Sequence, residues 1–186
     1  MDLFEFILII TSVIYAMGVA QILSGISRLA QAEARIRWFI PHTLWVIILF
    51  VYIFLVWWSA WEFRDLEWTF PTYLYMVLAP TLTYFACSLL VPQKTDSAEI
   101  DLQAHFFHIR RPFLWSFLLA TFAAVLDGSV LDDEPLWFPS RVGHVLLIAT
   151  ILVGLFTNNK RVHAGVAFVV MLALSYIAVS RLWNPR

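Results

Sequence analysis

The sequence predicts an all-α, polytopic membrane protein with six transmembrane helices in two similar halves. Composition is the first reason: 61% of the 186 residues are hydrophobic and 13% are charged, whereas soluble proteins average roughly half apolar and a quarter charged residues. Length is the second, because six apolar segments of about 20 residues, each enough to cross about 30 Å of hydrocarbon, take up the chain. The third is an internal repeat of small residues. We expect no soluble domain beside the helices.

The first three helices are expected over residues 3–29, 41–61 and 71–91. The first is an unbroken apolar run behind an acidic start, so we interpret it as a retained helix; a cleaved secretory signal has a basic start. The second and third open on Pro41 and Pro71, and proline suits the first turn because its missing N–H has no helical partner there.

Pro80 lies inside the third predicted helix. It removes one helical hydrogen bond and clashes with the preceding turn, so we expect a kink at this position. Thr81 and Thr83 are close enough in sequence for their hydroxyls to bond to the freed backbone carbonyl.

The last three helices are expected over residues 112–130, 140–156 and 163–183, with Pro112 opening the fourth. Residues 100–109, just before it, mix apolar and polar side chains and predict an amphipathic helix at the membrane interface.

Two ladders of small residues at every fourth position predict the repeat. The first ladder is Ser12, Ala16, Ala20 and Ser24, and the second is Ser116, Ala120, Ala124 and Gly128. Residues 82–90 and 174–182, in the third helix of each half, share five of nine residues. Three crossings per half invert the second half relative to the first, an arrangement found in many transporters. Small residues let membrane helices approach closely, so we expect the two ladders to face each other.

The predicted halves are residues 1–92 and 112–186, and residues 93–111 are a cytoplasmic linker between them. The first half has more residues than the second between its ladder and the later shared segment (residues 82–90 in the first half and 174–182 in the second). The additional residues correspond to the aromatic, charged segment around residues 57–70, which we interpret as the most specialised surface of the protein.

Lysine and arginine in the loops predict the orientation, because cytoplasmic loops carry an excess of both. One side holds Arg28, Arg35, Arg37, Lys94, Arg110, Arg111, Lys160 and Arg161. The other side holds Arg64, Arg141, Arg181 and Arg186. We therefore expect the more basic side in the cytoplasm and both termini on the non-cytoplasmic side of the inner (cytoplasmic) membrane.

Several functional classes are disfavoured. A net charge of −1 without a basic stripe argues against nucleic-acid binding. The sequence has no phosphate-binding glycine loop, no Ser/His/Asp set and no transmembrane lysine suited to a retinal Schiff base, so we expect neither enzymatic activity nor a cofactor.

Permeation of an ion or small solute through a homo-oligomer is the leading hypothesis, because bundles with inverted repeats often move solutes. The polar residues expected to line a path are Gln21, Thr83, Tyr84, Asp127, Ser175 and Tyr176. Inversion would place Tyr84 toward one face and Tyr176 toward the other, as a matched pair of constrictions. The competing interpretation is hydrogen bonding between helices, or for Asp127, at the external end of the fourth helix, a solvated helix end.

Two further groups of residues carry alternative functions. The charged residues Glu62, Arg64, Asp65 and Glu67 lie in a tryptophan-rich segment and predict an external vestibule in which Arg64 pairs with Glu62 or Asp65. The same segment fits an aromatic belt, or a docking surface on a non-transporting accessory or sensor protein. The weak metal or haem candidates are His42, His105, His108 and His163, all on the predicted cytoplasmic side; hydrogen-bonded interfacial histidines are the alternative.

Overall fold

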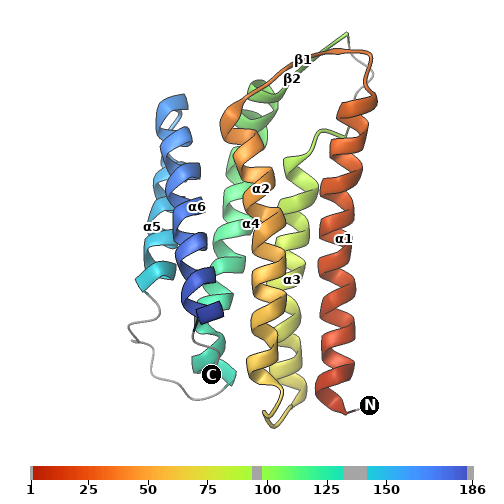
Figure 1. Ribbon diagram of the computed structural model, residues 1–186, viewed down its shortest axis with the longest axis vertical. Coiled ribbons are helices and arrows are strands. Elements are labelled where there is room, and N and C mark those ends of the chain that lie inside the picture. The colour runs from red at the N-terminus through yellow and green to blue at the C-terminus, as the bar shows by residue number, and fades with distance from the viewer. Residues whose placement is uncertain (1, 94–97, 132–141, 184–186) are drawn as a thin grey trace.

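The computed structural model describes residues 2–93, 98–131 and 142–183, which form a bundle of antiparallel helices (Figure 1). The helices are α1 (Leu3–Gln31), α2 (Ile40–Ser59), α3 (Phe70–Leu90), α4 (Leu102–Leu131), α5 (Val142–Phe156) and α6 (Lys160–Trp183). A short 3₁₀ helix, η1 (Ala60–Phe63), extends α2. In Figure 1, α1 stands at one edge of the bundle and α5 and α6 stand at the other.

Five of these helices are long and apolar enough to cross a membrane: α1, α2 with η1, α3, α4 and α6. Many of their apolar side chains are exposed, as expected for surfaces that face lipid: Ile9, Val13, Phe54, Leu119 and Leu172 are examples. The chain is therefore compatible with a multi-pass membrane protein. The sixth predicted span is not confirmed, because α5 has 15 described residues and reaches only about 22 Å. Residues 140 and 141, its predicted start, lie outside the described residues.

The fourth helix begins earlier than the sequence predicts. Pro112 lies inside α4, and the predicted interfacial helix at residues 100–109 is mostly the first turns of the same helix. The Asp101 carboxylate caps this start by accepting hydrogen bonds from the backbone N–H groups of Gln103 and Ala104, both at 2.9 Å. The Ala104 N–H and the Arg37 guanidinium lower the pKa of the Asp101 carboxyl below its usual value. Phe106 is fully buried, which explains why this segment packs into the bundle.

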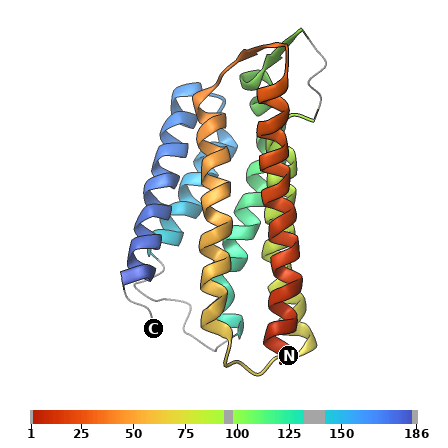
Figure 2. The ribbon, with the colours of Figure 1, turned by 45° about the vertical axis from the view of Figure 1, so that its right-hand side comes forward.

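Two short parallel strands join the first loop to the third at one end of the bundle (Figure 2). Strand β1 (Arg35–Arg37) pairs with β2 (Glu99–Asp101), with Ile36 opposite Ile100. Arg37 adds ion pairs to Glu99 at 3.5 Å and to Asp101 at 3.0 Å. This pairing was not predicted, and it ties α1 and α2 to the start of α4.

An aromatic cluster fills the space between α2 and α4. The Trp45 ring contacts Phe113 and Phe117 edge-on, with ring centroids 5.1 and 5.5 Å apart, and Tyr52 contacts Phe117 at 5.0 Å. Trp45, Phe113 and Phe117 are fully buried. The centre of the bundle at this level is thus a packed core.

The small-residue ladders do not face each other, contrary to the prediction. The inward stripe of α1 is Phe4, Ile7, Thr11, Tyr15, Gly18, Ile22, Gly25 and Leu29, while Ala16, Ala20 and Ser24 are exposed and Ser12 is half-buried. On α4, Ala120 is fully buried and Ser116 and Ala124 are half-buried; the side of Gly128 lies outside what is described. The physical reason is that α1 buries its bulky side chains, and the small ones on the opposite face turn outward.

The inverted repeat is not confirmed by the helix packing. The most extensive pairs are α3 with α4 and α1 with α3. In a repeat of α1–α3 by α4–α6, the counterpart of the α1–α3 contact is an α4–α6 contact, and that pair is not among the closely packed ones in the described chain. Instead α6 packs against α5 and α2.

The two ladders therefore respond differently to added bulk. Ala120→Leu should lower the free energy of unfolding by about 1–3 kcal/mol, because a buried small residue leaves no room for the additional carbon atoms of leucine. Ala16→Leu should leave the stability of the single chain close to wild type, because Ala16 is exposed. Thermal unfolding in one detergent compares the two variants. Equal destabilisation would contradict the outward orientation of the first ladder.

Gly25 is required where α1 passes the end of α3. A Cβ atom at this position would lie 1.8 Å from the Val91 Cγ1 and 2.6 Å from its Cβ. Val91 is buried and β-branched, so it has few other rotamers. Gly25→Ala should therefore lower the free energy of unfolding by about 2 kcal/mol or more. In a thermal unfolding experiment this appears as a markedly lower unfolding temperature.

Gly165→Ala in α6 is the matched control for Gly25→Ala, because a Cβ there meets nothing within 4 Å. This variant should gain about 0.5–1 kcal/mol, since alanine is the better helix former. A Gly25→Ala protein as stable as Gly165→Ala in detergent would show that α1 and α3 are not packed this tightly.

Candidate functional site

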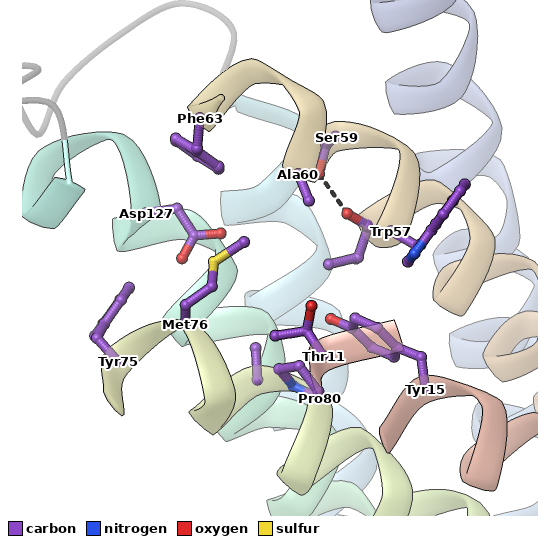
Figure 3. Close-up of a pocket in the computed structure, with 12 residues that line it drawn as sticks. Thr11, Tyr15, Trp57, Ser59, Ala60, Phe63, Tyr75, Met76, Pro80 and Asp127 are labelled. Atoms are coloured by element: carbon purple, nitrogen blue, oxygen red, sulfur yellow. Dashed lines mark hydrogen bonds between the residues drawn. The ribbon is translucent and has the colours of Figure 1, made fainter. Parts of the chain in front are cut away.

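A pocket lies between α1, α2, α3 and α4 near the end of the bundle where α1 begins (Figure 3). Its cavity volume is about 20 Å³, which is room for about one water molecule. Its lining includes Thr11, Tyr15, Met76, Pro80 and Asp127. Thr11 and Tyr15 follow the start of α1 by two to three turns, about 12–18 Å along the helix. The pocket therefore reaches into the apolar part of the bundle.

Asp127 supplies a carboxylate to this pocket. Its side chain is half-buried, and Figure 3 shows it directed toward Met76, with the hydroxyl groups of Thr11 and Tyr15 across the pocket. In the five candidate spans the other acidic residues are Glu5 and Glu62, which are both exposed in terminal turns. A carboxylate among apolar helices is costly unless it is paired or lines water, which makes Asp127 the strongest candidate functional group in the described chain.

The turn of α3 that faces this pocket has an altered hydrogen-bond pattern. Pro80 has no N–H, so the Met76 carbonyl one turn earlier loses its helical donor. The predicted replacement by Thr81 or Thr83 is wrong: their hydroxyls donate to the carbonyls of Val77 and Ala79, each at 2.8 Å. The carbonyl freed by Pro80 belongs to a pocket-lining residue, on the helix that faces Asp127.

Two tyrosines of the pocket were missed by the sequence analysis. The Tyr75 hydroxyl donates to the Ala123 carbonyl at 2.5 Å, one turn before Asp127, and so joins α3 to α4 at this level. Tyr15 is buried on the inward stripe of α1. The signal for Tyr15 was present, because it follows Thr11 by four residues on that stripe. Thr11 itself bonds to the carbonyls of Ile7 and Leu8, both at 3.1 Å.

The other predicted path residues do not meet in one place. Thr83 is buried and bonded within its own helix, and Gln21 and Tyr84 are half-buried outside the pocket. Ser175 and Tyr176 are exposed, and Ser175 bonds to the Met171 carbonyl at 2.9 Å. Tyr176 borders a separate surface hollow between α5 and α6. Of the six predicted residues, only Asp127 lines the pocket near the start of α1.

The predicted vestibule residues lie at the same end of the bundle as the pocket. Arg64 pairs with Asp65 at 3.2 Å, one of the two partners predicted for it, and its guanidinium lies 5.4 Å from the Trp61 ring centroid. Glu62 and Glu67 are exposed. Trp57 donates to Ser12 at 2.7 Å, so one ladder residue holds a tryptophan in place beside the pocket.

The histidines hydrogen-bond to backbone carbonyls. His42 and His105 both bond through Nε2 to the Leu90 carbonyl, at 2.9 and 3.1 Å. His163 bonds through Nε2 to the Thr157 carbonyl at 3.1 Å, and His108 is exposed. The described residues contain no group of three or more His, Cys, Asp or Glu side chains placed to hold a metal ion. These contacts match the alternative interpretation of the histidines as hydrogen-bonding groups.

Comparisons of the chain with known protein families, with curated proteins and with solved structures found no match.

Tyr75→Phe tests the contact between α3 and α4 beside the pocket. The variant loses the hydrogen bond to Ala123 and should lower the free energy of unfolding by about 1 kcal/mol. Tyr73→Phe is the control, since Tyr73 is half-buried on the same helix and its ring packs on Phe70. Thermal unfolding in detergent measures both, and equal stability of the two variants would contradict a structural role for the Tyr75 hydroxyl.

Proposed function

We propose that the protein binds a small cation in the pocket around Asp127, as the outer binding site for its permeation across the membrane. The single observation that carries this proposal is the half-buried carboxylate inside an apolar helical bundle. Ionisable groups within membrane helices are rare and commonly mark ion and substrate pathways.

The chemistry of the lining supports a cation over an anion. The polar groups near Asp127 are oxygens: the hydroxyls of Thr11 and Tyr15 and the Met76 carbonyl that Pro80 deprives of its donor. Carboxylate, carbonyl and hydroxyl oxygens suit hard cations.

The surrounding charge favours the same ligand. The described acidic side chains at this end are Asp2, Glu5, Glu62, Asp65 and Glu67, and the basic residues are Arg64 and, in the last turn of α6, Arg181. Negative charge around the mouth of a pocket raises the local concentration of cations. The proposal takes this end as the external face, with the basic end in the cytoplasm, in line with the loop charges.

Passage beyond the pocket requires a second arrangement of the helices. The aromatic cluster around Trp45 fills the space between α2 and α4, so the described arrangement fits a closed or occluded state. A closed state of this kind fits an alternating-access mechanism, in which one group of helices moves against another. A homo-oligomer and the two-half organisation remain predictions on which this proposal does not depend.

A flux assay with purified protein in liposomes tests the proposal. Wild-type protein should accelerate uptake of at least one member of a panel of small monovalent cations over empty liposomes. Asp127→Asn should reduce this flux by about tenfold or more, because a charge-assisted contact is worth about 1.5–3 kcal/mol.

Glu67→Gln is the matched control for the flux assay: it removes one negative charge from the same end, outside the pocket. This variant should keep most of the flux. Equal loss in both variants would attribute the effect to surface charge, and no flux of any cation through folded wild-type protein would overturn the proposal.

Partner docking is the second candidate function. Trp58 and Trp61 are more than 60% exposed at the same end, which fits either an aromatic belt or a contact with another protein. A membrane subunit that co-purifies with wild type in mild detergent, and is lost with Trp58→Ala and Trp61→Ala, would favour docking over permeation when flux is absent.

A further inference from the structure

The end of the bundle opposite the pocket carries most of the positive charge. The described basic residues there are Arg28, Arg35, Arg37, Arg110, Arg111, Lys160 and Arg161, and the described acidic ones are Glu33, Glu99 and Asp101. Arg37 is the member that forms ion pairs, with Glu99 and Asp101. Of the other six basic residues, Arg28 lies on α1 and Arg35 on β1, and the remaining four belong to the start of α6 or to the segment of α4 that contacts the turn before it.

Arg110 is the central residue of this basic end. Its side chain is only 5% exposed, and its Nη1 donates to the Thr157 carbonyl and to the Asn158 side-chain oxygen. The guanidinium also lies 5.9 Å from the Phe107 ring centroid. These contacts hold Arg110 against the loop between α5 and α6.

The charge of Arg110 has no carboxylate partner in the described part of the chain. Both of its acceptors are neutral, and its buried Nε has no hydrogen-bond partner among these residues. A buried cation without a counter-charge is costly. An anion from outside the chain would supply the missing negative charge.

Three exposed cations surround the turn that Arg110 holds: Arg111 follows it on α4, and Lys160 and Arg161 begin α6. The backbone dipoles at the start of α6 add a partial positive charge, and the Asn159 side chain accepts a hydrogen bond from the Arg161 backbone N–H at 2.9 Å. Apolar side chains lie next to these cations. Trp115, one turn after Arg111, is 48% exposed, and Phe156, at the end of α5, is 84% exposed.

We propose that this cluster binds the headgroup of an anionic phospholipid on the cytoplasmic side of the membrane. The phosphate would lie between Arg110, Arg111, Lys160 and Arg161, and the acyl chains would run along Trp115 and Phe156. Arginine pairs with phosphate through two parallel hydrogen bonds. Basic sites between membrane helices at the headgroup level bind anionic lipids in this way. A lipid explains why the exposed apolar side chains of Trp115 and Phe156 lie beside the cations, because its acyl chains would contact them. A free phosphate ion has no apolar part that could do so.

Lipid titration of the full chain in detergent tests this site without any flux measurement, so its outcome is separate from that of the proposed function. Phosphatidylglycerol should raise the unfolding temperature more than phosphatidylcholine with the same acyl chains. Inorganic phosphate at the same concentration should produce no shift. Equal shifts with both lipids, or a shift with inorganic phosphate that accounts for the lipid effect, would overturn the proposal.

Variants locate the site. Arg110→Gln should abolish the preference for phosphatidylglycerol if the variant folds. The double variant Lys160→Gln with Arg161→Gln changes only exposed residues, and its apparent affinity should fall roughly 30-fold. The double variant Arg35→Gln with Arg64→Gln removes the same charge elsewhere and should keep the wild-type affinity. Equal affinity in the two double variants would overturn the assignment.

Discussion

The backbone carbonyl of Leu90 is the point on which the packing of the bundle depends. Leu90 ends α3 and is fully buried, and a buried carbonyl at a helix end must find a donor. His42 of α2 and His105 of α4 both donate to it. Since α3 also packs against α1 and α4, these two bonds connect the central helix to its neighbours at the basic end.

The early start of α4 follows from the same contact. His105 reaches Leu90 only if residues 102–111 are helical and packed, and the Asp101 cap begins the helix at the required place. The β1–β2 pair then brings the first loop over this end. The mixed polarity of residues 100–109 predicted a helix at the membrane surface, but this segment is an integral part of the bundle.

Apolar length predicted most of the helices, because a span requires a continuous apolar run and five of six runs form long helices. Spacing was less informative about contacts. Ala16 and Ala120 occupy matching rungs of the two ladders, yet one is exposed and the other buried. Small residues permit close approach but do not select the partner. The bulky stripe of Ile7, Tyr15 and Ile22 decided which face of α1 turned inward.

The candidate site was predictable only in part, for a related reason. Asp127 stands out in the sequence because it is acidic in an apolar segment, whereas Tyr15 and Tyr75 resemble ordinary membrane tyrosines until the helices are placed. Pro80 predicted a kink in the third helix; α3 runs on through it as one α-helix, and Pro80 lines the pocket together with Asp127. The two ends of the bundle thus differ in how their polar groups are satisfied. At the basic end, backbone carbonyls accept hydrogen bonds from buried histidines and from Arg110. Because these acceptors are neutral, the charge of Arg110 is not balanced by them, and the proposed lipid phosphate would balance it. At the pocket end, Thr11, Tyr15 and Asp127 place hydroxyl and carboxylate oxygens around one small cavity, and the proposed cation site is argued from that oxygen-rich lining.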